Sequence, residues 1–187
     1  MILLSNPDKS QWTEILKRPV MDTENLFDTV QVILDRVKSE GDQAVIAYAE
    51  KFDQAILTSL SVSDEEQLAA ETQVSEELKA AIRLAKQNIE TFHAAQRFDG
   101  QKIETQPGVT CWQKAVGIEK VGLYIPGGTA PLFSTVLMLA VPAKIAGCKE
   151  IVLCTPPGKD GKIHPAVLFA AKVAGVNLIF KAGGVQA

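Results

Sequence analysis

The first part of the chain shows the spacing of amphipathic helices. Between a possible cap at Thr23 and a glycine stop at Gly41, apolar residues recur every three or four positions at Leu26, Val30, Ile33 and Val37. After Ser75 the same spacing places one apolar face at Leu78, Ile82, Ala85, Ile89 and Phe92. We therefore predict a helical N-terminal region over residues 1–97.

Shorter helices are expected within the same region. The spacing of Trp12, Ile15 and Leu16 indicates a helix that Pro19 ends. Asp42 can cap a helix over DQAVIAYAEKFD, and Ser63 with Glu66 forms the pattern of a capping box.

The helical spacing disappears in residues 98–120, which we interpret as a connecting segment. Pro107-Gly108 is a turn signal, and the stretch from Val109 to Ile125 has the composition for one or two strands. We expect Trp112 to lie in the core rather than to stack on a ligand.

From Val121 onward short apolar runs alternate with helical patterns. The runs GLYI, EIVLCT and NLIFKA are expected strands. Ser134-Thr135 would cap one helix, which runs to Gly147. Pro142 inside it predicts a kink or an unwound first turn, and a second helix would end at Gly175. Strands alternating with helices favour parallel pairing with right-handed crossovers. The predicted fold class is α/β, a helical N-terminal region followed by a partial Rossmann-like parallel sheet (βαβαβ), with an incomplete nucleotide-binding domain over residues 121–187.

Composition narrows the possible partners. The 187 residues are 47% hydrophobic and 22% charged with a net charge of −3, which is typical of a soluble globular protein and argues against nucleic acid or an anionic membrane as the main partner. The N-terminus lacks a signal-peptide pattern, and no apolar run approaches the roughly 20 residues that span a bilayer. Three cysteines without CxxC spacing are expected to be buried or free thiols in a reducing compartment, the cytoplasm: Cys111, Cys148 and Cys154.

Two glycine pairs follow expected strands. Gly127-Gly128 lies after the first strand and Gly183-Gly184 after the third, at the carboxyl ends where open α/β sheets bind ligands. Adjacent glycines and a following helix N-terminus suit a phosphate or a nucleotide. Ordinary βα turns also need glycine, and neither GxGxxG nor GxxxxGK[ST] is present, so both interpretations stay open.

At this loop the sequence resembles the histidinol dehydrogenase family. The stretch VGLYIPGGTAPLFSTVLMLAVPAKIAGCKEIVLCTPP matches the signature region of that family. Further matches are VKSEGDQAVIAYAEKFD, AIRLAKQNIETFHAAQ and IFKAGGVQA, so the resemblance covers most of the chain.

The resemblance implies an oxidoreductase of histidine biosynthesis, a branch of amino-acid biosynthesis. Such an enzyme uses NAD and zinc to oxidise L-histidinol through the aldehyde to L-histidine, and it acts as a homodimer with a shared active site. The family contacts NAD through the Tyr of LYxPGG and the Gln of GGxQA, which are Tyr124 and Gln186 here. A tyrosine at a strand end offers a ring face and a hydroxyl, and a glutamine offers a donor and an acceptor.

The family's catalytic Glu-His pair and its zinc ligands lie downstream of the segment that Gln186 matches. We therefore expect a truncated chain that is inactive alone, with no catalytic residue and no zinc ligand. His93 and His164 are expected to be structural or solvated. The sheet would lack a covering helix on one face, which leaves an apolar patch and an unpaired edge.

Two other functions stay open at this point. The chain could be non-catalytic and act by association with a separate downstream half or with its own copy. It could also be an aldehyde-dehydrogenase-like enzyme with Cys154 as nucleophile, although no neighbouring base in the sequence would activate that thiol.

Overall fold

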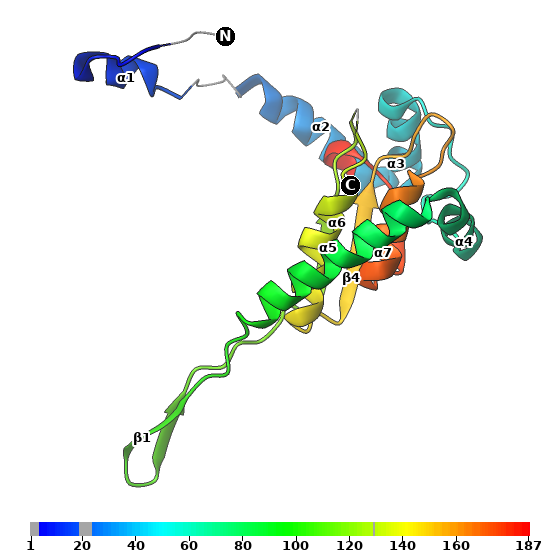
Figure 1. Cartoon of the computed structure of the whole chain (residues 1–187). Helices are drawn as coiled ribbons and strands as arrows, with labels where there is room; N and C mark the ends of the chain where they lie inside the picture. Colours follow the sequence, from blue (N-terminus) through cyan, green and yellow to red (C-terminus); the bar gives the residue numbers. More distant parts are fainter. Residues whose placement is uncertain (1–3, 19–23, 129) are drawn as a thin grey trace.

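The computed structural model describes residues 4–18, 24–128 and 130–187. An N-terminal helical arm and a long β-hairpin project from opposite ends of a body of helices packed on a small sheet (Figure 1). The α/β class and the order of helices before the sheet are as predicted.

Three parallel strands form the sheet of the body. They are β3 (Lys120–Tyr124), β4 (Glu150–Thr155) and β5 (Leu178–Lys181), in the spatial order β3-β4-β5. Leu123 pairs with Leu153, and Leu153 pairs with Ile179, so one row of aliphatic side chains crosses the face that enters the core. The strand segments and their parallel pairing confirm the prediction.

Helices cover one face of this sheet. The crossover helices α6 (Phe133–Ile145) and α7 (Pro165–Ala174) pack against each other, and α5 (Glu76–Ala94) packs outside them (Figure 1). The interior side chains of α7 are almost all buried because this helix lies between the sheet and two further helices, α5 and α4 (Asp64–Gln73). The main core therefore lies between the sheet and these helices.

The ends of the crossover helices agree with the sequence in part. Gly147 and Gly175 follow their helices with φ of +83° and +77°, the left-handed conformation that favours glycine, as predicted. The predicted cap of α6 by Ser134-Thr135 is wrong. Leu132 is the N-cap and offers no side-chain acceptor, so Ser134 and Thr135 lie within the first turn. The helix runs through Pro142 to Ile145.

The N-terminal arm and its neighbours are helical. A 3₁₀ turn at Lys9–Gln11 (η1) leads into α1 (Trp12–Ile15), and the arm continues with α2 (Glu24–Glu40); Pro19 and Thr23 lie outside the described residues. After α2 come α3 (Asp42–Tyr48) and a π-helical turn, η2 (Ala49–Asp53).

The starts of α3, α4 (Asp64–Gln73) and α5 test three predictions. Gly41 (φ +60°) is the N-cap of α3 and Asp42 is its first residue, so the predicted Asp42 cap is wrong. The capping box of Ser63 with Glu66 is confirmed at the start of α4. The predicted start of a helix at Ser75 is confirmed, and the Ser75 side chain caps α5.

The apolar face of α5 packs as its spacing predicts, except at its end. Leu78, Ile82, Ala85 and Ile89 contact the core, whereas Phe92 is exposed. The chain leaves the body just after this residue, so none of the described elements covers Phe92.

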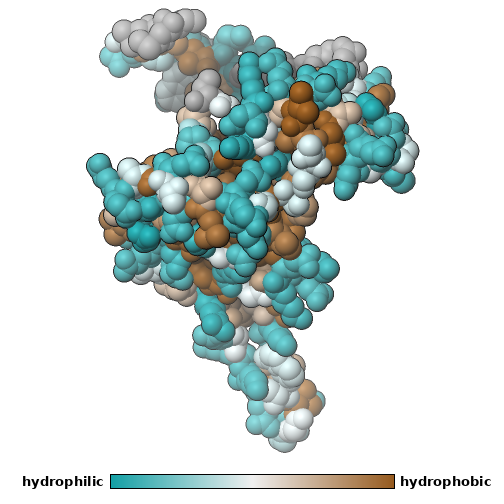
Figure 2. All heavy atoms as spheres, turned by 90° about the vertical axis from the view of Figure 1, so that its right-hand side faces the viewer, coloured by the Kyte–Doolittle hydropathy of each residue, from teal (hydrophilic) through white to brown (hydrophobic). Residues whose placement is uncertain are grey.

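The connecting segment forms a projecting hairpin. Strands β1 (Lys102–Gln106) and β2 (Val109–Trp112) pair antiparallel around the predicted Pro107-Gly108 turn. Figure 2 shows the hairpin as a narrow extension below the body. The prediction that Trp112 lies in the core is wrong. This side chain is 58% exposed, and the Lys102 ammonium lies 5.8 Å from its ring centroid.

The face of the sheet opposite the helices carries partly exposed side chains. These are Tyr124, Val152, Cys154, Leu178 and Phe180. The predicted apolar patch is therefore present. The edge at β5 is not free, however, because Val62 donates to Ile179 and Lys181 donates to Leu60. Among the described helices, none is long and apolar enough to cross a membrane.

Candidate functional site

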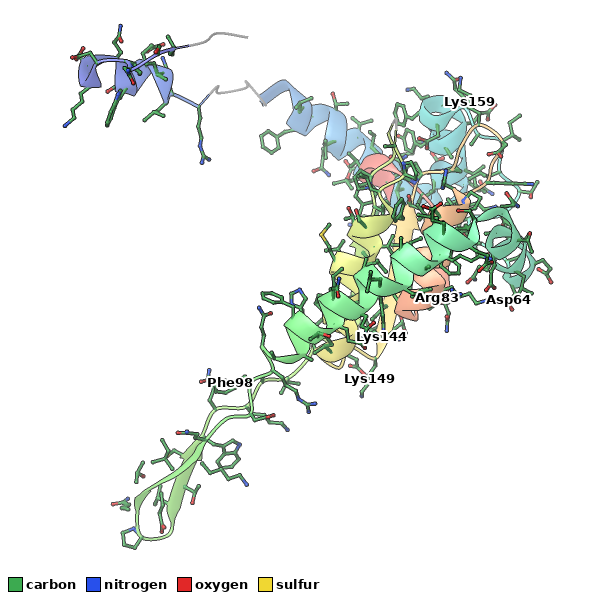
Figure 3. The ribbon with its side chains drawn as sticks, viewed as in Figure 1. Asp64, Arg83, Phe98, Lys144, Lys149 and Lys159 are labelled. Carbon is green, nitrogen blue, oxygen red and sulfur yellow. The ribbon has the colours of Figure 1, made fainter. Side chains whose placement is uncertain are left out.

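An open cleft of about 830 Å³ lies at the carboxyl ends of the three strands. Figure 3 places Lys149, before β4, and Lys159, after it, at opposite ends of the body, and the cleft is at the Lys159 end. Its walls come from the loops after β3 and β4, from Gly184 after β5, and from Asp53 and α4. This is the location that the parallel sheet predicts for a ligand.

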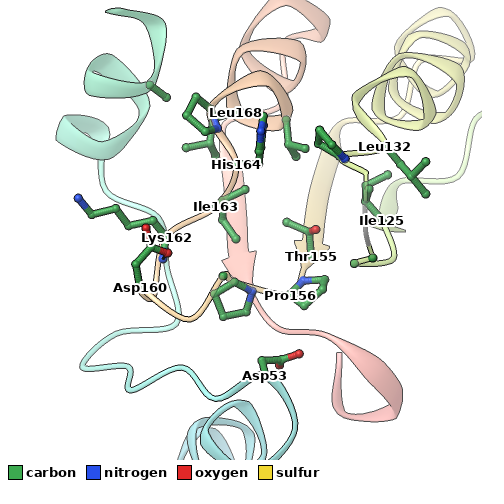
Figure 4. A pocket seen from close by; sticks show the side chains of 18 of the residues that line it. Asp53, Ile125, Leu132, Thr155, Pro156, Asp160, Lys162, Ile163, His164 and Leu168 are labelled. Atoms are coloured by element: carbon green, nitrogen blue, oxygen red, sulfur yellow. Dashed lines mark hydrogen bonds between the residues drawn. The ribbon is translucent and has the colours of Figure 1, made fainter. Parts of the chain in front are cut away.

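Pro156 separates the two glycine loops. It follows β4 directly and occupies the middle of the cleft in Figure 4. A Cβ on Gly127 would lie 2.5 Å from its Cγ, and a Cβ on Gly183 would lie 2.5 Å from its Cβ. Close packing on one proline ring therefore accounts for a glycine in each loop, without any requirement for a phosphate.

Tyr124 joins the first strand to the second glycine loop. Its hydroxyl accepts a hydrogen bond of 2.9 Å from the backbone N–H of Gly184. The side chain lines the cleft and is 41% exposed, so its ring can meet a ligand. A phenolic hydroxyl that accepts one hydrogen bond can still donate another, so Tyr124 can donate to a ligand.

Gln186 lies close by but is turned inward. It is 7% exposed and belongs to the 3₁₀ turn η3 (Gly184–Gln186), which packs against α2. Its Oε1 lies 2.8 Å from the position that a Cβ on Gly184 would take, and Gly184 has a φ of +65°. The loop thus places Tyr124 and Gln186 on either side of Gly184, but only Tyr124 and Gly184 line the cleft.

The helix that follows β4 is capped from within the cleft wall. Nδ1 of His164 accepts a hydrogen bond from the backbone N–H of Ala166, which caps α7. His164 is exposed, as predicted. His93 is half-buried in α5, where its Nδ1 lies 2.8 Å from Oε1 of Gln96, outside the cleft lining.

Cationic groups stand free along the same wall. Lys159 and Lys162 line the cleft and form no ion pair among the residues described. Asp160 accepts a hydrogen bond from the backbone N–H of Lys162, not from its ammonium. Glu66 also lines the cleft, and its carboxylate pairs with the buried Lys181 ammonium at 2.8 Å. Two lysines therefore remain available to an anionic group.

Sequence reasoning did not single out Asp53. Its Oδ2 is buried and has no hydrogen-bond partner in the described part of the chain. Burial raises the pKa of the Asp53 carboxyl above its ordinary value. The available signal was the end of the KFD stretch, which the resemblance included without assigning it a role.

The cysteines do not form a reactive centre. All three are free, and burial raises the pKa of the Cys154 thiol, which disfavours the nucleophilic thiolate. Cys154 lies on β4, outside the residues that line the cleft. In the described ranges no three His, Cys, Asp or Glu side chains gather in a way that could hold a metal ion.

The chain is similar in sequence to known proteins over most of its length. A family model described as histidinol dehydrogenase matches residues 16–187. A histidinol dehydrogenase of Bacteroides fragilis is 71% identical over 187 residues, which are 100% of this chain and 44% of that relative. The histidinol dehydrogenase of Escherichia coli K12 is 51% identical over 178 residues, or 95% of this chain and 40% of that relative.

The fold agrees with a solved structure of the same family. A crystal structure of histidinol dehydrogenase from Elizabethkingia anophelis superposes with a TM-score of 0.91 at 51% identity, covering 97% of this chain and 42% of that one. This chain thus spans less than half the length of the relatives it matches. The family match, the identities and the shared fold agree, and the chain belongs to the histidinol dehydrogenase family.

Proposed function

We propose that this chain supplies the N-terminal, nucleotide-binding part of a histidinol dehydrogenase, which oxidises L-histidinol to L-histidine in histidine biosynthesis. The observation that carries the proposal is the cleft at the carboxyl ends of β3, β4 and β5, where Tyr124 holds the loop that leads to Gln186. NAD, when bound, accepts the hydride in each of the two oxidations.

The cleft has features that suit a dinucleotide. The Tyr124 ring and the Leu132 side chain are both partly exposed and can contact a base or a nicotinamide ring. Ile125 and Leu168 also line the cleft but are buried (Figure 4). Lys159 and Lys162 are free to contact phosphates. Helix α6 begins at Phe133, and its N-cap Leu132 has no side-chain acceptor, so no capping side chain competes with an anion for the N–H groups at the start of the helix.

Gln186 is the second proposed NAD contact. Because its side chain is buried beneath Gly184, we propose that it reaches the ligand when the Gly183-Gly184 loop moves away from Tyr124. In the described structure the Gln186 side chain packs against Gly184 of this loop.

The described residues do not fit a zinc site, since no suitable ligand group gathers among them. We propose that the zinc ligands and the proton-transferring Glu-His pair come from the downstream part that the longer relatives possess. The free cysteines are the feature that supports a cytoplasmic location, and the resemblance supports a homodimer.

The test is the appearance of NADH. Purified chain mixed with L-histidinol and NAD should give no increase in NADH absorbance. Addition of a separately expressed downstream half of a relative such as the Bacteroides fragilis enzyme should restore the increase. Activity of the isolated chain, or no restoration although the two halves bind each other, would contradict the proposal.

A second candidate is a non-catalytic chain that acts by association. The exposed face of the sheet, with Leu178 and Phe180, and the exposed Trp112 of the hairpin favour it. Size-exclusion chromatography with light scattering distinguishes the two candidates. Self-association without NAD binding would favour the second, whereas a monomer that binds NAD would remove it.

A further inference from the structure

Asp53 stands at the cleft because of the turn that ends the third helix. It is the last residue of η2, and Gln54 after it adopts the left-handed conformation with φ of +57°. From the end of this turn, Asp53 lines the cleft. Figure 4 draws it across Pro156 from His164, on the side of the loop that leads to Gly184.

The carboxyl group of Asp53 lacks a partner in the described structure. Its Oδ2 is buried and receives no hydrogen bond. No lysine of the described residues is the partner of this carboxyl group either. Lys181 pairs with Glu66, and Asp53 belongs to none of the ion pairs among the described residues. Native proteins rarely leave a buried polar atom unpaired, and an exception beside a cleft indicates a partner that arrives with the ligand.

The chemistry of the missing partner can be narrowed. A carboxylate accepts hydrogen bonds and attracts cations, but a metal ion would need further acidic or histidine ligands, which do not gather around Asp53 in the described residues. A phosphate group cannot be the partner, because it and the Asp53 carboxylate are both negatively charged. Among the hydrogen-bond donors of a dinucleotide, the adenine amino group and the nicotinamide amide each offer a single nitrogen. A ribose offers two adjacent hydroxyls, which match the two oxygens of one carboxylate.

We propose that Asp53 is a ligand-binding residue of this cleft and accepts hydrogen bonds from the vicinal hydroxyls of a ribose. The inference rests on the proposed function, since it assigns a ribose of the dinucleotide to the side of the cleft that Asp53 forms. Lys159 and Lys162 stand on the loop after β4, so the cleft offers cations for phosphates and one carboxylate for a diol.

The test compares ligand affinities by isothermal titration calorimetry. Asp53→Asn keeps the size of the side chain and removes its charge. We expect it to weaken NAD and ADP-ribose binding about tenfold, the typical contribution of a charge-assisted hydrogen bond. Binding of inorganic pyrophosphate, which has no diol, should not weaken. Asp99→Asn removes an equal charge at an exposed position beside the hairpin and should leave all three affinities unchanged.

The outcomes separate this inference from the proposed function. Equal NAD affinity in the wild-type chain and Asp53→Asn would overturn the role of Asp53 alone. An equal loss for NAD and pyrophosphate would also overturn it, because it would indicate general damage to the cleft. Binding of ADP-ribose but not NAD, with the loss confined to Asp53→Asn, would support Asp53 and contradict the proposed function. Absence of binding by both ligands to the wild-type chain would overturn both.

Discussion

The hydroxyl of Tyr124, at the end of β3, accepts a hydrogen bond of 2.9 Å from the backbone N–H of Gly184, which lies beyond β5. Tyr124 ends one outer strand of the sheet, Gly184 follows the other outer strand, and β4 with Pro156 lies between them. One side chain therefore spans the end of the sheet and fixes the loop that leads to Gln186.

Removal of this bond should loosen the loop without disturbing the core. Tyr124→Phe keeps the ring and deletes only the acceptor, so we expect a loss of about 1 kcal/mol in the free energy of unfolding. Amide hydrogen exchange at Gly184 should accelerate. The amide of Val62, bonded to Ile179, is the internal control and should exchange as before. Unchanged protection of Gly184 would show that the bond does not hold the loop.

The packing of the two glycine loops on Pro156 predicts the cost of added methyl groups. Gly127→Ala and Gly183→Ala each place a Cβ 2.5 Å from the proline ring, so we expect each to destabilise the chain by about 1–3 kcal/mol. Gly122→Ala in β3 meets open space and is the matched control. Urea denaturation measures the three differences, and equal stability of all variants would contradict the packing.

A double-mutant cycle with Pro156→Ala sharpens this test. The Gly127 methyl would meet Cγ of Pro156, which alanine lacks, and the remaining Cβ is 3.6 Å away. The Gly183 methyl would still meet Cβ at 2.5 Å and Cα at 3.2 Å. Pro156→Ala should therefore rescue Gly127→Ala but not Gly183→Ala. Rescue of both, or of neither, would mean that the loops adjust in another way.

The α/β half of the fold could be predicted because its signals are local. The strands around Leu123, Leu153 and Ile179 are apolar runs, and Gly147 and Gly175 end the helices between them. The pairing of Leu60 and Val62 with β5 could not be predicted, since so short a segment has no period. Trp112 was wrongly assigned because an exposed hairpin and a buried strand share the same composition.

The site could be predicted in location but not in detail. The carboxyl ends of parallel strands indicated the cleft, and the resemblance indicated Tyr124 and Gln186. The burial of Gln186 depends on its packing under Gly184. Asp53 lies in a turn that is distant in sequence from the strands whose ends form the cleft. Both depend on tertiary packing, which the pattern of residues along the sequence does not predict.

The Cys154 thiol should react more slowly than the Cys111 thiol. Burial raises its pKa, so at neutral pH less of it is thiolate, whereas Cys111 is exposed on the hairpin. Alkylation with iodoacetamide followed by peptide mass spectrometry should label Cys111 first. Chain unfolded in urea provides the control, in which the difference should disappear. Selective labelling of Cys154 in the folded chain would restore the nucleophile hypothesis.

The unpartnered carboxyl of Asp53 should lower stability at neutral pH. Its folded pKa is raised by burial above the ordinary value of 3.8, so the ionised form is disfavoured in the folded state. The penalty is present above the folded pKa and disappears as the pH falls below the ordinary value. Asp53→Asn should therefore raise the Tm at neutral pH, and the difference should vanish in acid. A difference that grows on acidification would contradict this sign; Asp99→Asn is the control.

The central claim is that the cleft binds NAD, and an NMR titration tests it most directly. With ¹⁵N-labelled chain, addition of NAD should shift the amide signals of Tyr124, Thr155 and Gly184, which line the cleft, and leave that of Cys111 on the hairpin unchanged. Saturable shifts confined to the cleft are the predicted result. An absence of shifts at these three residues, or saturable shifts only elsewhere on the chain, would contradict the account.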